Sequence, residues 1–145
     1  MSEKSKKYIA VILKILLIVS ALVWSFFMVV MTGAGLVFNC ESYGHYIMQT
    51  GVFFIISGIL MVSGTLLSLF RKKIQNIISV ILSLTGFILC MIMLYRLVNH
   101  ADHNGWTDNF TLTPISDMYK ARIMPVIVPS VLSVATAVRN YFSYK

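Results

Sequence analysis

Three neighbouring residues in the second half of the chain have side chains that bind metal ions. They are His100, Asp102 and His103, with the two histidines three residues apart. In a helix that spacing puts both imidazoles on one face, where they could hold a divalent ion such as Zn²⁺ or Cu²⁺. We therefore name His100, Asp102 and His103 as a hypothetical metal site. The same stretch, through Trp106, fits a solvated turn without a ligand equally well.

Other polar residues of this kind lie close to these three in the predicted loops. They are Cys40, Glu41, His45 and Asp108. Asn109-Phe110-Thr111 also matches a glycosylation sequon, which matters only in a eukaryotic secretory pathway. Since polar residues collect in the external loops of membrane proteins in any case, these residues add little to the metal hypothesis.

Beyond these loops the sequence has no motif for catalysis or for a cofactor. It contains no Gly-rich phosphate loop, HExxH or GxSxG pattern. The two cysteines, Cys40 and Cys90, are far apart and do not form a CxxC pair. We therefore expect no cofactor and no enzymatic activity.

The apolar composition of the chain indicates the kind of protein that carries these residues. Of the 145 residues, 58% are hydrophobic and only 12% are charged, and the mean hydropathy is +0.83. Soluble domains carry roughly 25% charged residues. The composition therefore excludes an ordinary soluble enzyme and a disordered chain, and it predicts an integral membrane protein.

Four apolar runs in the sequence are candidates for membrane crossings, each of which needs about 20 apolar residues. We place helices at residues 9–38, 47–70, 77–98 and 118–142, with outer loops at 39–46 and 99–117 and an inner loop at 71–76. The fold class is thus all-α: an integral membrane four-helix (tetraspan) bundle, with residues 1–145 as a single membrane domain. The fourth run is the shortest, and a re-entrant or surface-lying helix is its alternative.

The distribution of basic residues predicts the orientation, because cytoplasmic loops of membrane proteins are enriched in Lys and Arg. One side carries nine of the 12 basic residues: Lys4, Lys6, Lys7, Lys14, Arg71, Lys72, Lys73, Arg139 and Lys145. We therefore predict that the N- and C-termini are cytoplasmic and that the membrane is the cell membrane. The net charge of +7 then reflects topology, and nucleic acid is not an expected partner.

Small residues recur along one face of each predicted helix, as in helices that pack closely within a bilayer. The stripes are Ala21, Ser25, Met28 and Thr32; Gly51, Gly58 and Thr65 beside Thr50, Ser57 and Gly64; Ser79, Ser83, Gly86 and Cys90; and Ser130, Ser133 and Ala137. We interpret them as packing seams, and a hydroxyl-lined pathway for a solute is the alternative. Pro125 and Pro129 are expected to kink the fourth helix, as hinges in transporters do.

The apolar runs contain no Asp, Glu or His, although an ionisable residue in a membrane usually marks function. This argues against a proton-coupled exporter and against a haem-binding bundle. The most consistent role is non-enzymatic: an accessory, interaction or protective membrane protein. A small transporter or channel subunit acting as an oligomer is the second hypothesis, and an enzyme or metal-binding protein using the outer His/Asp loop is the third. Expected partners are membrane lipids and, among proteins, another membrane protein or a second copy of the chain.

Overall fold

The computed structural model describes residues 3–38, 44–70, 72–106, 114–121 and 123–142. These residues form helices and no strands. The first long helix is continuous and comprises α1 (Glu3–Trp24), the π-helical segment η1 (Ser25–Val30) and α2 (Met31–Phe38). The others are α4 (His45–Leu67), α5 (Lys73–His103), the short α6 (Ile115–Ala121) and α7 (Ile123–Phe142).

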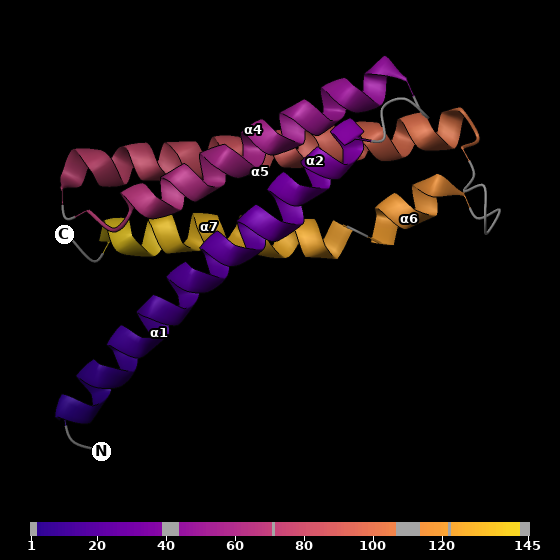
Figure 1. Cartoon of the computed structure of the whole chain (residues 1–145). Coiled ribbons are helices and arrows are strands. Elements are labelled where there is room, and N and C mark those ends of the chain that lie inside the picture. The colour runs from indigo at the N-terminus through magenta and orange to yellow at the C-terminus, as the bar shows by residue number, and fades with distance from the viewer. Residues whose placement is uncertain (1–2, 39–43, 71, 107–113, 122, 143–145) are drawn as a thin grey trace.

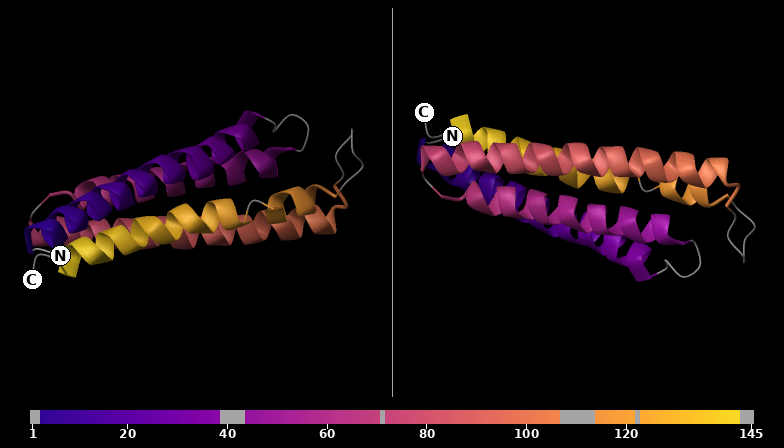
Figure 2. Two further views of the ribbon diagram at one scale, coloured as in Figure 1. Left: turned by 90° about the horizontal axis from the view of Figure 1, so that it is seen from below. Right: turned by 90° about the horizontal axis from the view of Figure 1, so that it is seen from above.

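The helices form two layers that run roughly along a common direction. One layer holds α5 with α6 and α7, and the other holds α4 with the first helix (Figures 1 and 2). Four helices are long and apolar enough to cross a membrane: Lys7–Phe38, His45–Leu67, Lys73–His103 and Ile123–Phe142. The all-helical prediction and the four apolar helices are therefore confirmed, and α7 reaches spanning length despite its two prolines.

The two ends of the bundle differ in which parts of the chain they hold. At one end α1 begins, α4 leads into α5, and α7 ends (Figure 1). We call it the basic end, because exposed Lys72, Lys73 and Arg139 lie there. The opposite end holds the start of α4, the end of α5 and the short helix α6. Because the described residues form an even number of long helices, the start of the first and the end of the last lie at the same end of the bundle.

The helix bounds differ from the predicted ones where polar residues continue a helix. α5 has 31 residues, so it includes the last part of the predicted inner loop 71–76 and the first part of the predicted outer loop 99–117. α4 ends at Leu67, before the predicted residue 70. The predicted helix 118–142 consists of parts of α6 and α7. The predictions followed hydropathy, but a helix continues through polar residues because its backbone hydrogen bonds do not depend on side-chain polarity.

The prolines of α7 interrupt it less than expected. Pro125 is the third residue of the helix, where a backbone N–H has no partner within the helix anyway. Pro125 therefore lies just after the boundary between α6 and α7, and the kink expected there stays a prediction. Pro129 lies in the helix interior, and α7 is nevertheless assigned as one helix through Phe142.

The first helix changes its packed face at η1. Its buried residues are Ile18, Ala21, Ser25, Val29, Gly33 and Leu36, whereas the predicted stripe ran through Met28 and Thr32, which are only half-buried. A π-helical turn holds more residues than an α-helical turn, so the inward face shifts by one position after Ser25. The predicted seam was thus wrong at Met28 and Thr32 and right at Ala21 and Ser25.

Polar and apolar side chains are distributed as expected for a protein surrounded by lipid. Many large apolar side chains are exposed on every long helix. The buried positions, in contrast, include a set of small polar residues: Ser25, Thr50, Ser57, Thr65, Ser68, Ser79, Ser83, Ser130, Ser133 and Thr136. A soluble bundle shows the reverse pattern, with an apolar stripe facing inward and a polar surface.

Candidate functional site

At the end opposite the basic end, His100 lies between two aromatic side chains. Its ring stacks on that of Tyr46, with centroids 3.8 Å apart and planes at 21°. On the other side it meets Trp106 edge to face, with centroids 5.0 Å apart. The Tyr46 hydroxyl donates to the backbone carbonyl of Arg96 at 3.4 Å. This cluster joins the start of α4 to the end of α5, and so links the two layers.

The end of α5 places Trp106 in this cluster. The Gly105 N–H bonds the Asp102 carbonyl at 3.3 Å, and the Trp106 N–H bonds the Ala101 carbonyl at 3.2 Å. Together with the left-handed Gly105, φ 59°, these bonds form a Schellman motif, which ends a helix and turns the chain back onto it. The stretch predicted as either helix or turn is therefore helical through His103, with a turn at Asn104 and Gly105.

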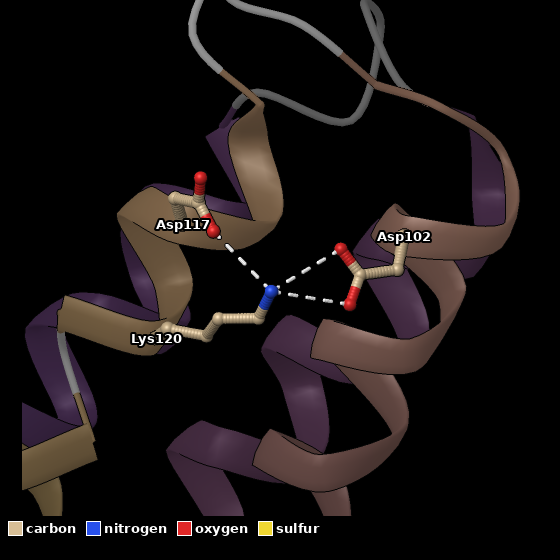
Figure 3. A network of polar contacts seen from close by, with 3 residues as sticks. All are labelled: Asp102, Asp117 and Lys120. Carbon is tan, nitrogen blue, oxygen red and sulfur yellow. Dashed lines mark hydrogen bonds and ion pairs between the residues drawn. The ribbon is translucent and has the colours of Figure 1, made fainter.

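Lys120 of α6 forms an ion-pair network with two carboxylates at this end (Figure 3). Its ammonium lies 3.2 Å from Asp117 on the same helix and 3.3 Å from Asp102 on α5. The neighbouring carboxylates, Asp117 first and then Asp102, raise the pKa of Lys120 above its usual value. Asp102 also accepts a hydrogen bond from Ser116, which is buried. These contacts attach α6 to the end of α5.

The three residues of the hypothetical metal site lie in different surroundings. His100 is in the aromatic cluster, Asp102 is bound by Lys120 and Ser116, and His103 is exposed. Among the described residues, no group of three or more His, Cys, Asp or Glu could hold a metal ion. The metal site stays a prediction, and it would require Asp102 to leave Lys120. Cys40, Glu41, Asp108 and Asn109 lie outside the described residues.

Within the bundle, hydroxyls of the predicted seams join α4 to α5. Ser57 on α4 donates to the Gly86 carbonyl of α5 at 2.7 Å. Two turns closer to the basic end, Ser79 on α5 donates to the Gly64 carbonyl of α4 at 2.6 Å. The glycines permit this approach: a Cβ on Gly86 would lie 2.8 Å from the Ser57 carbonyl, and one on Gly64 would lie 2.9 Å from the Ser79 carbonyl.

Ser133 brings α7 into the same seam. Its hydroxyl lies 2.7 Å from that of Thr65 and 3.1 Å from the Met61 carbonyl, both on α4. It also lies 3.5 Å from the hydroxyl of Ser83 on α5. One side chain of α7 thus contacts both of the helices it packs between, and the hydroxyls satisfy one another there.

Cys90 of α5 lies on the same seam, farther from the basic end. The cysteine is free and fully buried, as predicted. The hydroxyls of Ser57 and Ser130 lie within hydrogen-bonding reach of its thiol, and Ser130 also donates to the Val126 carbonyl at 2.7 Å. The thiol is therefore surrounded partly by hydroxyls of the seam.

At the basic end, two buried amides were missed from the sequence. Asn140 donates to the Ser68 hydroxyl at 2.9 Å, while its carbonyl oxygen and both polar atoms of Asn76 have no hydrogen-bond partner among the described residues. The signal for both lay in the stripes: Asn76 extends Ser79, Ser83, Gly86 and Cys90 by one turn, and Asn140 extends Ser130, Ser133 and Ala137. The sequence places Asn76 in the predicted inner loop 71–76 and Asn140 near the end of the predicted helix 118–142, and neither is among the predicted seam residues.

Most seam residues are thus buried, and the hydroxyls of Ser57, Ser79 and Ser133 bond between helices. The predicted small residues of α4, α5 and α7 are buried throughout, and their hydroxyls bond to backbone carbonyls or to one another. In a membrane such contacts contribute about 0.6 kcal/mol each on average. The arrangement is suited to holding helices together.

Comparison with known proteins identifies no family: no protein-family model, no curated protein and no solved structure matches the chain. Function has to be inferred from the contacts within the molecule.

Proposed function

We propose that the chain is an integral protein of the cell membrane with both termini in the cytoplasm. Its role is non-enzymatic, as an accessory, interaction or protective protein. The membrane location is supported by four helices of sufficient length and hydropathy and by exposed apolar side chains along them. The orientation is supported by the basic residues at the end where α1 begins and α7 ends.

The observation that most supports the non-enzymatic role is that hydroxyls inside the bundle are bonded to neighbouring helices. Ser57, Ser79 and Ser133 use their hydroxyls to bond neighbouring helices. A hydroxyl whose proton is donated to a backbone carbonyl cannot donate a hydrogen bond to a passing solute as well. The seam therefore supports a packed scaffold more than a pathway.

An interaction role is supported by the first helix. The N-terminal half of α1 extends away from the other helices (Figure 1), and its apolar side chains are exposed around it, among them Tyr8, Ile12 and Leu16. Lipid tails cover such a surface by default, and a helix of another membrane protein or of a second copy fits it equally well.

Two measurements test this proposal together. The tagged full chain is expressed, membranes are washed with alkaline carbonate, and the protein is purified in mild detergent with its partners identified by mass spectrometry. Retention in washed membranes and a stoichiometric partner are expected, and proteoliposomes with the purified chain should show no ion flux above empty liposomes. Release by carbonate would contradict the membrane location, and specific flux would contradict the non-transport role.

A transporter or channel subunit is the second candidate, favoured by one specific observation. Buried polar atoms of Ser25, Asn76 and Asn140 lack partners among the described residues, and Ser25 lies in a π-helical turn, a feature frequent at functional sites. If such groups line a pathway in an oligomer, Asn76→Leu and Pro129→Ala should each change a measured flux. Flux that neither variant alters would remove this candidate.

A further inference from the structure

An apolar groove runs along the outside of the bundle between α5 and α7. Near the basic end a cavity of about 280 Å³ is lined by Ile77, Val80, Ile81 and Tyr141. Next along the same helix pair, a cavity of about 250 Å³ has Leu84 and Phe87 on the α5 side. Both cavities open to the outside of the bundle, where lipid would be.

The register of α5 makes the two cavities one continuous feature. Ile77, Val80, Leu84 and Phe87 are spaced by three, four and three residues, so they follow one face of the helix. The α7 side continues the same line with Tyr141, Val138, Val134 and Val131. At 1.5 Å per residue, residues 77–87 extend about 15 Å, which is half of a hydrocarbon core of about 30 Å. The groove therefore matches the depth of one leaflet.

A single lysine continues this line beyond the apolar groove. Lys73 is four residues before Ile77 and lies in the first turn of α5, where it is exposed. Neighbouring Lys72 precedes the helix with an extended backbone, φ −111° and ψ 132°, so it does not share the line. Lys73 thus presents a positive charge at the mouth of the groove, at the depth where phosphates of lipid headgroups lie.

Asn76 lies on the turn that follows Lys73. It is 1% exposed, and neither its amide nitrogen nor its oxygen has a partner among the described residues. Asn76 precedes Ser79 by one turn on the buried seam, and it is not among the residues that line the two cavities. It is therefore not part of the groove, whose positive charge comes from Lys73.

We infer that this groove is a binding site for an anionic phospholipid, with the phosphate at Lys73 and an acyl chain along α5 and α7. Charge complementarity at Lys73 and the leaflet-length apolar lining select this occupant over a peptide or a soluble ligand. The inference rests on the proposed membrane location. It adds a specific lipid to that proposal and does not depend on which protein partner is found.

The test is lipid binding by the purified full chain in mild detergent, followed by native mass spectrometry. Phosphatidylglycerol and phosphatidylcholine with identical acyl chains are titrated separately. We expect tighter binding of phosphatidylglycerol, and Lys73→Ala should weaken it about fivefold, as for the loss of one basic residue at a membrane surface. Lys72→Ala is the matched control and should retain at least most of the binding.

A second pair of variants tests the groove itself. Ile81 lines the groove and is 56% exposed, and Ile59 on α4 is 53% exposed but lines neither of the two cavities. Ile81→Trp should fill the groove and weaken the binding of both lipids, while Ile59→Trp should leave it unchanged. Because both side chains face outward, neither variant is expected to prevent folding, and melting temperatures check this.

The possible results separate this site from the proposed membrane location. Equal losses for Lys73→Ala and Lys72→Ala, no preference for the anionic lipid, or no effect of Ile81→Trp would each overturn the site. Release of the wild-type chain from membranes by carbonate would overturn the membrane location instead. A chain that stays in washed membranes but binds both lipids equally contradicts the lipid site alone.

Discussion

Two glycines meet backbone to backbone where α2 packs against α4. A Cβ on Gly33 of α2 would lie 2.6 Å from the Gly51 carbonyl oxygen of α4, and one on Gly51 would lie 2.7 Å from the Gly33 carbonyl oxygen. The contact is therefore reciprocal, and both positions need glycine because the obstacle is backbone that cannot move aside.

Gly33→Ala should destabilise the bundle, whereas Gly35→Ala on the same helix should not. Overpacking costs about 1–3 kcal/mol, but a Cβ on Gly35 meets nothing within 4 Å. Replacing that helical glycine should instead gain about 0.5–1 kcal/mol. Unfolding in mixed micelles with increasing denaturing detergent measures both values. Equal effects of the two substitutions would contradict the close contact.

Lys120 should respond to amine-acylating reagents at a higher pH than a free lysine. Its raised pKa means that the charged form is stabilised by the fold. That contribution is complete below the usual lysine value of 10.5 and is lost as the pH rises through the folded pKa. Labelling followed by mass spectrometry should give a midpoint above the usual value.

Asp117→Asn should lower the labelling midpoint of Lys120 the most, because Asp117 is the first cause of the shift. Asp102→Asn should lower it as well and should also loosen α6 from α5. The acylating reagent can reach Lys120, because the side chain is 45% exposed. A midpoint that neither variant moves would rule out the ion-pair network.

At the scale of the element, η1 decides which residues of the first helix face inward. The buried residues are Ile18 and Ala21 before η1, Ser25 and Val29 within it, and Gly33 and Leu36 after it. The step of four from Ser25 to Val29 and again to Gly33 is longer than an α-helical face maintains on average. Removal of one exposed residue inside η1 would turn the three consecutive steps of four from Ala21 to Gly33 into the alternating steps of three and four that a regular α-helix keeps.

Deletion of Phe27 should therefore be tolerated. Phe27 is 58% exposed within η1, and without it the packed face remains on one side of a regular helix. Deletion of Phe53, which is exposed in the middle of α4, should rotate half of a regular helix by about 100° and destroy its seam. Melting temperatures and size-exclusion profiles compare the two, and equal destabilisation would contradict this account of η1.

The sequence indicated the stripes of α4, α5 and α7 correctly because those helices keep a regular period. It failed at Met28 and Thr32 because a π-helical turn leaves no mark in composition. The amides Asn76 and Asn140 were missed because polar residues at the flanks of an apolar run suggest solvent exposure. Likewise, the pairing of His100 with Tyr46 and of Asp102 with Lys120 depends on contacts between distant segments, which periodicity cannot reveal.

For the whole molecule, the arrangement of the two cysteines makes the orientation measurable. Cys90 is fully buried, while Cys40 lies in the predicted outer loop and outside the described residues. An impermeant maleimide applied to intact cells should therefore label the wild-type chain, and Cys40→Ala should abolish the labelling. Labelling of Cys40 only after lysis would reverse the proposed orientation.

The splayed first helix also gives the molecule a shape within the bilayer. At the basic end the start of α1 stands apart from α4, α5 and α7, and toward the opposite end α2 packs against α4 (Figure 1). In a bilayer, lipid would have to fill the angle between α1 and α7 on the basic side. At the opposite end the layer of α2 and α4 spreads away from that of α5 and α6 (Figure 2), so the protein would widen in both leaflets and would favour neither direction of membrane curvature.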